Sequence, residues 1–206
     1  MSFIIAGIHT GIGKTVCSTV CCQALGWDYW KPVQAGDLDN SDSQFVKKNT
    51  NNPSIKIHRE RYQLQTPMSP HKAAEIDGVT IKKEDFILPE TNNQLIVETA
   101  GGIMSPLAAN FLIVDLIAHL QLPAIVVSNN YLGSINHTLL TVEALLQRNI
   151  LIKGIIFSGE EINSSREFIL HHTRLPLLFS IPQFANINAS VIDTFVKNSS
   201  IKSALC

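Results

Sequence analysis

The feature that most restricts the possible folds of this chain is a glycine-rich segment close to the N-terminus. An apolar run, Phe3–Ala6, leads directly into Gly7–Thr15, which reads GIHTGIGKT, and a helical pattern follows. This strand–loop–helix order is the context that a phosphate-binding loop, or P-loop, requires. Gly11 and Gly13 would allow backbone N–H groups to converge on phosphate oxygens, where the helix N-terminus adds its partial positive charge.

The end of this segment supplies the two side chains that such a loop uses. Lys14 would bridge the β- and γ-phosphates of a nucleotide, and the Thr15 hydroxyl would ligate Mg²⁺. One position departs from the usual pattern, because Ile8 stands six residues before the lysine and Gly7 lies one residue too early. The alternative is a glycine-rich turn with an incidental lysine. The placement of Gly-Lys-Thr after the first strand favours the nucleotide site.

Short apolar runs alternate with helical patterns along the rest of the chain. The runs are β-branched or aromatic and mostly apolar throughout, as expected of strands buried on both faces of a parallel sheet. The predicted strands are Ser2–Gly7, Trp27–Pro32, Gln94–Thr99, Pro123–Ser128, Lys153–Ser158 and Leu177–Ile181. The predicted helices are Lys14–Leu25, Ser41–Lys48, Asn110–Leu120, Ile135–Arg148, Ser164–Thr173 and, closing the pattern, Ala189–Lys197. The alternation predicts an α/β fold with a doubly wound, mostly parallel sheet and helices on both faces, of the P-loop NTPase type.

The segment Asn49–Leu88 is the least regular part of the sequence. It contains Pro53, Pro67 and Pro70 and is interpreted as loop-rich. Long loops at the carboxyl edge of a parallel sheet are a common place for ligands to bind. This segment is therefore a candidate for ligand binding.

Chain length and charge narrow the classes of function. The 206 residues suffice for one substantial core and are too few to expect two, so a single domain, residues 1–206, is predicted. The formal net charge of −1 gives no electrostatic case for nucleic-acid binding. No apolar run approaches the roughly 20 residues that span a bilayer, and the N-terminus lacks the basic start of a signal peptide. We expect a cytoplasmic protein that binds neither nucleic acid nor membrane.

Two acidic residues could complete a metal site beside the P-loop. Glu98 ends an apolar strand, Leu95–Val97, and precedes the flexible sequence Thr-Ala-Gly-Gly. A carboxylate at the carboxyl end of a strand is well placed to hold Mg²⁺. Asp42 lies in the polar stretch Leu38–Asp42, and composition alone favours a solvated turn carboxylate at this position.

Four further motifs follow the P-loop in order and extend over nearly the whole chain. They read KPVQAG, SPHKAA, VETAGG and LGSINHT, and they occupy Lys31–Gly36, Ser69–Ala74, Val97–Gly102 and Leu132–Thr138. Together with the P-loop they resemble the motifs of the dethiobiotin synthetase family. A P-loop alone is weakly specific, but five ordered motifs at compatible spacing strongly indicate this family.

The resemblance implies an ATP-dependent cyclo-ligase of biotin biosynthesis. In the family's reaction, CO2 (or bicarbonate as its source) and one amine of 7,8-diaminononanoate form a carbamate. The carbamate attacks the γ-phosphate of ATP to give a carbamic–phosphoric anhydride. The second amine then displaces phosphate and closes the cyclic urea of dethiobiotin, leaving ADP. Because anions meet at every stage, lysines and Mg²⁺ are expected to neutralise them.

The resemblance also assigns roles to individual residues of this sequence. Lys14, Lys31 and Thr10 correspond to catalytic positions, and Thr15, Asp42 and Glu98 to Mg²⁺ ligands, which overrides the solvated interpretation of Asp42. The implied ATP-binding residues are Gly11, Ile12, Gly13, Lys14, Thr15, Val16, Asp42, Glu98, Ser158, Pro182, Gln183 and Phe184. The implied substrate-binding residues are Ala35, Gly101, Leu132, Gly133, Ile135 and Asn136.

The family is dimeric, which implies a homodimer with shared active sites. Its Leu-Gly-x-Ile-Asn segment, here Leu132–Asn136, reaches the substrate bound by the opposite subunit. The apolar side of the helix that this segment opens, with Leu139, Leu140 and Leu145, is expected to be buried in the fold or in the dimer interface. The alternative is that Asn136 merely caps a helix in its own chain.

Three positions depart from the family's pattern. Ala35 replaces a residue that usually carries a hydroxyl, Thr99 replaces the glycine after the acidic residue, and Ser158 stands where an asparagine usually reads adenine. These departures concern substrate contacts and base selectivity more than the phosphate chemistry.

Three other functions compete with this assignment. Another P-loop amide ligase, such as a cobyrinate-type synthase, would need further segments for which the chain has no room. A nucleotide switch of the cell-division or partition type usually carries an extra lysine early in the P-loop, where this chain has His9. A degenerate relative would bind ATP without turnover, an alternative that Ala35 keeps open.

Overall fold

A central parallel sheet runs through the molecule. The computed structural model describes residues 1–160 and 162–205. Within them, seven strands lie in the order β11-β10-β9-β1-β6-β2-β4, and every neighbouring pair is parallel. The strands are β1 (Phe3–Gly7), β2 (Asp28–Trp30), β4 (Ile57–His58), β6 (Leu95–Glu98), β9 (Ala124–Asn129), β10 (Ile152–Ser158) and β11 (Leu177–Ile181). All six strands predicted from the sequence are present, so the parallel sheet is confirmed.

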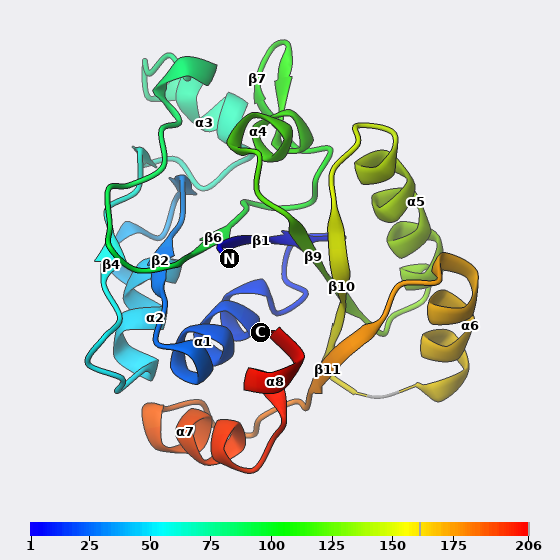
Figure 1. The fold of residues 1–206 in the computed structure, drawn as a ribbon. Helices are drawn as coiled ribbons and strands as arrows, with labels where there is room; N and C mark the ends of the chain where they lie inside the picture. The colour runs from blue at the N-terminus through cyan, green and yellow to red at the C-terminus, as the bar shows by residue number, and fades with distance from the viewer. Residues whose placement is uncertain (161, 206) are drawn as a thin grey trace.

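Helices cover both faces of the sheet, which confirms the doubly wound α/β architecture. They are α1 (Lys14–Leu25), α2 (Asp42–Asn49), α3 (Pro70–Ile76), α4 (Ile113–Leu120), α5 (Ser134–Leu146), α6 (Asn163–Thr173), α7 (Ala189–Lys197) and α8 (Ile201–Leu205). Figure 1 shows α1, α2, α7 and α8 on one face and α4, α5 and α6 on the other. Helix α1 packs against α2, α7 and α8, while α5 packs against α6 and β9.

The buried strands explain why the sheet lies at the centre. Phe3, Ile4 and Ile5 of β1 are fully buried, as are Ile125 and Val126 of β9. A strand that is apolar on both faces needs cover on both faces, and helices supply it. Strands β1 and β9 are neighbours, yet β1 continues into α1 on one face and β9 into α5 on the other. Loops that diverge in this way open a crevice at the carboxyl ends of the strands, where α/β proteins bind ligands.

The segment Asn49–Leu88 holds more structure than its proline content suggested. It contains β4, β5 (Tyr62–Leu64), α3 and the 3₁₀ turn η2 (Lys83–Asp85). Strand β5 pairs with β3 (Val33–Ala35) outside the central sheet. The expectation of a loop-rich segment was therefore wrong in part, because strands of two or three residues have no readable periodicity. Pro70 begins α3, since the first helical position needs no N–H donor.

Two other boundaries differ from the sequence prediction. The helix expected over Asn110–Leu120 begins only at Ile113, because the preceding residues form a hairpin of β7 (Pro106–Ala108) and β8 (Phe111–Leu112). The pattern also does not close at Lys197, since α8 follows and packs against α1 and β11.

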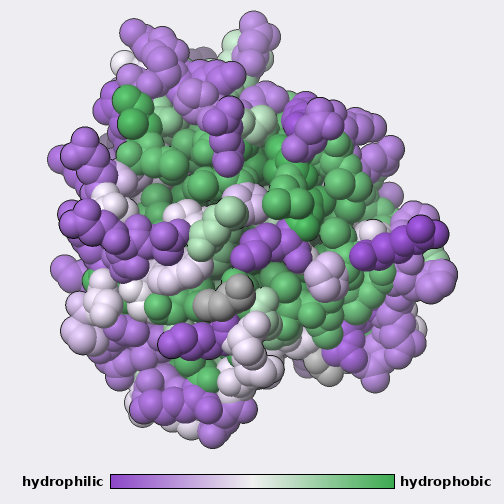
Figure 2. All heavy atoms as spheres, in the orientation of Figure 1, coloured by the Kyte–Doolittle hydropathy of each residue, from purple (hydrophilic) through white to green (hydrophobic). Residues whose placement is uncertain are grey.

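The face of the molecule seen in Figure 1 and Figure 2 has apolar surface through its middle and polar surface around it. Met1 and Leu151, both exposed, line a cavity of about 480 Å³ with Leu122 and Pro123. Among the described residues, no helix combines the length and the apolarity that crossing a membrane would require.

Candidate active site

The glycine-rich loop wraps around the side chain of Lys14. Gly11 and Gly13 have φ of 73° and 92°, a left-handed conformation that favours glycine. Gly13 is the N-cap of α1, so the first N–H groups of this helix face the loop without a side-chain cap. The Lys14 ammonium folds back and donates to the carbonyl oxygen of His9 at 2.9 Å. A side chain at Gly7 would come within 2.6 Å of the Lys14 stem, so this glycine leaves room for the lysine.

Three oxygen-bearing side chains converge at the first turn of α1. The Thr15 hydroxyl oxygen lies 2.6 Å from Asp42 Oδ1 and 2.9 Å from Glu98 Oε1. A hydroxyl has one proton, so it can donate to only one of the two carboxylates at a time. Asp42 begins α2 and Glu98 ends β6, so three elements meet at this point. The structure thus brings together the three residues that were expected to ligate a metal.

This oxygen set fits Mg²⁺. Magnesium is usually held by one or two carboxylates, with substrate phosphates and water completing the octahedron. Among the described residues there is no group of three or more His, Cys, Asp or Glu side chains that could hold a metal on its own. Two carboxylates and a hydroxyl beside a phosphate-binding loop therefore suit a metal that arrives with a nucleotide.

Lys31 follows β2 and contacts the same carboxylates. Its ammonium forms an ion pair with Asp42 Oδ2 and lies 3.9 Å from Glu98 Oε1. The sheet register explains this contact, because Trp30 lies opposite Val97 and the next residues on the two strands are Lys31 and Glu98. The lysine is buried, with 6% of its surface exposed.

Burial lowers the pKa of both lysines. It lowers the pKa of Lys14 to about 8, although Glu98 opposes the shift, and the neighbouring Lys31 adds to it. Burial likewise lowers the pKa of Lys31, while Glu98 and Glu60 act in the opposite direction. A buried ammonium near its titration range gains most from a bound anion, because the anion favours the charged form.

Tyr29 contacts the Glu98 carboxylate and was not identified by the sequence analysis. Its hydroxyl donates to Glu98 Oε2 at 2.9 Å, and burial raises the pKa of this phenol well above its ordinary value. The phenol therefore remains a donor and fixes one Glu98 oxygen while the other faces Thr15. A signal existed in the sequence: residues two apart on a strand share a face, so Tyr29 had to lie on the side of Lys31.

Thr10 and Gly101 also come together, beside a second part of the crevice. A side chain on Gly101 would lie 3.4 Å from the Thr10 hydroxyl oxygen and 2.8 Å from that of Ser105. Thr10 and Ser105 line a pocket of about 340 Å³ together with Gly102 and Met104. Of the predicted substrate residues, Gly101 thus lies beside the P-loop.

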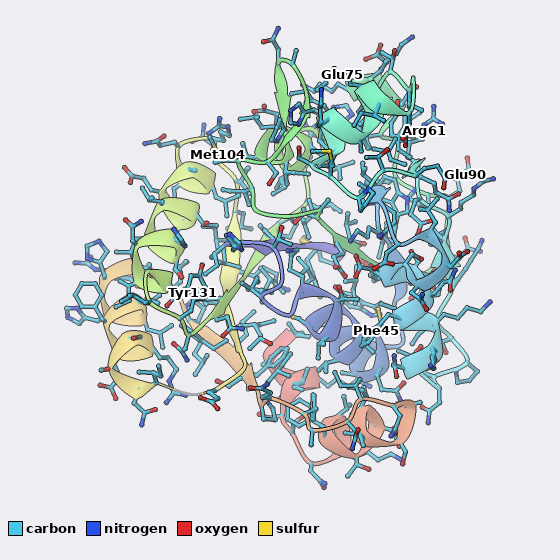
Figure 3. All side chains as sticks on the ribbon, turned by 180° about the vertical axis from the view of Figure 1, so that it is seen from behind. Phe45, Arg61, Glu75, Glu90, Met104 and Tyr131 are labelled. Carbon is cyan, nitrogen blue, oxygen red and sulfur yellow. The ribbon has the colours of Figure 1, made fainter. Side chains whose placement is uncertain are left out.

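His9 and His137 line this pocket, and the Tyr131 ring contacts both of them; we call these three rings the ring cluster. The His9 and His137 rings stack, with centroids 6.2 Å apart, and the Tyr131 hydroxyl lies 2.7 Å from His137 Nδ1. The His9 Nδ1 lies 2.7 Å from the carbonyl oxygen of Thr10. Met104 and Tyr131, labelled in Figure 3, come from the segments that follow β6 and β9. The ring cluster was not anticipated from the sequence.

The start of α5 exposes several residues that were expected to bind substrate. Leu132 is fully exposed, Asn136 is exposed, and Ile135 is partly buried. Gly133 is the N-cap of α5, with φ of 101° and no side-chain cap, so Asn136 does not cap this helix. The expected burial of the apolar side holds within the chain for Leu145, whereas Leu139 is partly buried and Leu140 is exposed.

The other predicted nucleotide residues come from the P-loop and the start of α1 and from the carboxyl ends of β10 and β11. Ile12 is buried, Val16 is partly buried within α1, and Ser158 ends β10 against the loop, where a side chain on Gly13 would collide with its hydroxyl. Pro182, Gln183 and Phe184 follow β11, and the Phe184 ring packs on Phe195 of α7 with centroids 5.4 Å apart.

The other two departures from the motif pattern have different environments. Thr99 is buried, and its N–H and hydroxyl both donate to the Ile5 carbonyl oxygen at 3.1 Å. The extra side chain is thereby tied to the backbone of β1. Ala35 ends β3 opposite Leu64 and is partly buried.

Comparison with known proteins identifies relatives over most of the chain. The family model described as an AAA domain matches residues 1–190. The ATP-dependent dethiobiotin synthetase of Christiangramia forsetii is 53% identical over 160 residues, which are 78% of this chain and 77% of that protein. The protein of the same name from Chlamydia pneumoniae is 40% identical over 194 residues, covering 94% of this chain and 87% of that protein.

Solved structures share the fold at low sequence identity. The crystal structure of a ParA family ATPase from Chlorobium tepidum matches with a TM-score of 0.57 and 13% identity, covering 99% of this chain and 96% of that chain. At this identity the likeness shows the fold alone. It confirms the P-loop NTPase type of sheet that was predicted from the sequence.

Proposed function

The chain belongs to the ATP-dependent dethiobiotin synthetase family, and we propose that it performs the family's ring closure with the residues gathered around its P-loop. The identity of its relatives, 53% and 40% over most of the chain, supports an ATP-dependent ligase that forms dethiobiotin in biotin biosynthesis. The proposed substrates are ATP, 7,8-diaminononanoate and CO2, and the products are dethiobiotin, ADP and phosphate. We further propose that residues 1–206 act as a single catalytic domain.

One observation carries the proposal: the Thr15 hydroxyl oxygen lies within 2.9 Å of a carboxylate oxygen of Asp42 and of one of Glu98, beside two buried lysines. When bound with ATP, Mg²⁺ would screen the charge of the phosphates and be held by these three side chains. Lys31 contacts Asp42 and Glu98 of this set, so its ammonium would stand beside the metal site and could face an anionic substrate.

The two lysines would neutralise charge as it moves along the reaction. Lys14 would bridge the β- and γ-phosphates, and Lys31 would stabilise the carbamate and the γ-phosphate that it attacks. Thr10, at the pocket of about 340 Å³, would donate its hydroxyl to the same reacting groups. In this proposal both cations would lie where negative charge is transferred from carbamate to phosphate, so they would lower the barrier of that step.

The nucleotide would be held by the backbone of Gly11–Gly13 and by the start of α1, including Val16. Its base would extend toward Ser158 and the segment Pro182–Phe184. A serine has a shorter reach than an asparagine and lacks its paired donor and acceptor, so we propose relaxed recognition of adenine.

The diamine would lie in the crevice between Ala35, Gly101 and the start of α5. We propose a homodimer in which Leu132–Asn136 of one subunit closes the site of the other. Leu132 is fully exposed, and among the described residues the Asn136 amide makes no hydrogen bond, which is consistent with a partner outside the chain. The Asn136 amide and the backbone near Gly133 would hold the carboxylate end of the substrate.

Phosphate release from ATP and Mg²⁺, with and without diaminononanoate and bicarbonate, tests the function. We expect release that depends on the diamine and dethiobiotin in equal amount. Release without the diamine would instead support a nucleotide switch, and ATP binding without release would support a degenerate relative.

A subunit-mixing experiment tests the shared site. Lys14→Ala and Asn136→Ala proteins, each nearly inactive alone, are allowed to exchange subunits in equal amounts. Random pairing makes about half of the dimers mixed, and each mixed dimer of an isologous interface contains one fully native site. About a quarter of all sites, and of the activity, should therefore return. No recovery despite demonstrated exchange would refute the shared site.

A further inference from the structure

The pocket at the ring cluster contains a side chain that can accept a proton. Its walls are otherwise neutral or apolar: Ile8, Thr10, Gly102, Ile103, Met104, Ser105, Leu140 and Thr141 line it with His9 and His137. Imidazole is the side chain that ordinarily changes charge in the neutral pH range. The pocket lies beside the P-loop, in the crevice where β1 and β9 diverge.

The contact of His9 with Thr10 fixes which ring nitrogen is free. A carbonyl oxygen only accepts hydrogen bonds, so His9 Nδ1, 2.7 Å from the Thr10 oxygen, must carry a hydrogen. In the neutral ring the lone pair therefore belongs to Nε2. The carbonyl of His9 itself accepts from Lys14 at 2.9 Å, so the same residue is fixed to the phosphate-binding lysine through its backbone.

The other groups around the His9 ring are less suited to accept a proton from a ligand. His137 Nδ1 is engaged by the Tyr131 hydroxyl at 2.7 Å, and burial raises the pKa of Tyr131. The Lys14 ammonium is a donor. His9 is exposed, so a proton that it accepts can pass to solvent.

The proposed reaction requires such an acceptor. Aliphatic amines have pKa values of about 10, so a diamine arrives as ammonium groups that have no lone pair for attack. Each nitrogen that forms a bond to the CO2 carbon must first lose a proton. A base held at the pocket would supply free amine at neutral pH.

We propose that His9 is a catalytic residue, the general base that deprotonates an ammonium group of the bound diamine. Nε2 takes the proton, the N–H bond breaks, and its electron pair remains on the substrate nitrogen. That pair then forms the bond to carbon, and the imidazolium returns its proton to water. The inference rests on the proposed function, since it assigns the acceptor of a proton that the ring closure releases.

Two substitutions remove the base while keeping its space. In His9→Asn the amide NH₂ can replace Nδ1–H as donor to Thr10, and in His9→Gln the longer amide occupies the position of Nε2.

General bases typically contribute about 10²–10⁴-fold, so kcat/KM for the diamine should fall by that order near neutral pH. The difference in kcat/KM between the unsubstituted and substituted proteins should narrow as pH rises toward the amine pKa of about 10, because the free amine then forms without a base. Added imidazole should restore part of the rate. His172→Asn, on exposed α6, is the matched control and should retain full activity.

The outcomes separate the role of His9 from the function itself. If the unsubstituted protein forms no dethiobiotin, the proposed function fails and the role of His9 fails with it. If it forms dethiobiotin and both substituted proteins, folded by thermal melting, match it, only the role of His9 is overturned. A loss that is the same at every pH and is not rescued by imidazole would show a structural role and would also overturn the proposal.

Discussion

Two buried polar clusters lie at opposite ends of the short strand β2. At its carboxyl end, Lys31 contacts Asp42 and Glu98, and these two carboxylates share the single hydroxyl proton of Thr15. At its amino end, Asp28 is the centre of an amino-end cluster in which every carboxylate lone-pair direction is used. Its Oδ1 accepts from the Lys56 N–H and from Asn93, both at 3.0 Å. Its Oδ2 accepts from Thr91 at 2.7 Å and contacts His58 Nε2 at 3.0 Å.

The difference distinguishes a structural carboxylate from one that can bind a ligand. Burial by itself would raise the pKa of Asp28, but the four hydrogen bonds outweigh it and lower the pKa below its ordinary value. The carboxyl-end cluster (Thr15, Lys31, Asp42 and Glu98) instead has more acceptor oxygens than donors. A saturated cluster stabilises the fold, whereas an undersaturated one gains from a cation that arrives from outside.

The largest effect is expected from removing the cation of the carboxyl-end cluster. Lys31→Ala should leave a folded protein whose turnover falls by about 10²–10³-fold or more, as is typical when a group aimed at developing charge is removed. Steady-state dethiobiotin formation measures turnover, and a thermal melt shows whether the substituted protein is folded. Lys153→Ala is the control. That lysine donates to the Leu205 carbonyl oxygen far from the P-loop, so its removal should not change turnover. Near-normal activity in Lys31→Ala would contradict the assignment.

The opposite result is expected at the amino end of the same strand. Asp28→Ala leaves four donors without their acceptor, so the free energy of unfolding should fall by about 3 kcal/mol. The protein that remains folded should keep its kcat. Chemical denaturation measures the first effect, and Glu90→Ala, an exposed acidic residue labelled in Figure 3, should change stability by less than about 0.5 kcal/mol.

The contribution of Asp28 should also depend on pH in one direction. Because its pKa is lowered in the folded state, the stabilisation is fully present above the unfolded carboxyl pKa, about 3.9, and is lost as pH falls through the lower folded value. The difference in stability between the unsubstituted protein and Asp28→Ala should therefore shrink in acid. A difference that stays constant would show that charge plays no part.

A smaller effect is expected at the edge of the nucleotide site, outside both clusters. Ser158 should read adenine weakly, so GTP or CTP should support turnover within about tenfold of ATP while the triphosphate contacts remain. Competition between nucleotides in the phosphate-release assay measures this ratio. A preference for ATP above roughly a hundredfold would mean that another group reads the base.

The smallest effect is expected where a neutral contact is restored. Ala35→Ser or Ala35→Thr should lower the KM for the diamine by about two- to tenfold, since a neutral hydrogen bond contributes roughly 0.5–1.5 kcal/mol. Initial rates over a range of diamine concentrations give the KM of each protein. If both substitutions weaken substrate use, the pocket is built around alanine.

The sequence predicted six of the seven central strands because they lie in apolar runs that need cover on both faces. It predicted α1 and α7 with the same bounds that the structure has. It did not predict β3, β4, β5, β7 and β8, since two or three residues cannot display a period. These pairings depend on which segments meet in space.

The same limit applies to the site. The resemblance predicted Thr15, Asp42 and Glu98 as metal ligands, and the fold brings them together. Tyr29 escaped notice because a tyrosine in an apolar strand is expected in the core, and its hydrogen bond depends on β6 lying next to β2. The ring cluster likewise requires β9 beside β1, a neighbour relation that no local pattern reveals.

The position of β1 has a consequence for how the protein is made. This strand pairs with β6, where Phe3 lies opposite Ile96, and with β9, where Ile4 lies opposite Ala124. Parallel pairings between distant segments form late, because a long stretch of chain must be closed before any contact is gained. The glycine-rich loop leaves the ribosome before either neighbour of its strand, and the strand finds both of them only after β9 has been synthesised. A nascent chain that stops before residue 124 would therefore lack the framework that shapes the loop, and ATP could not rescue its folding.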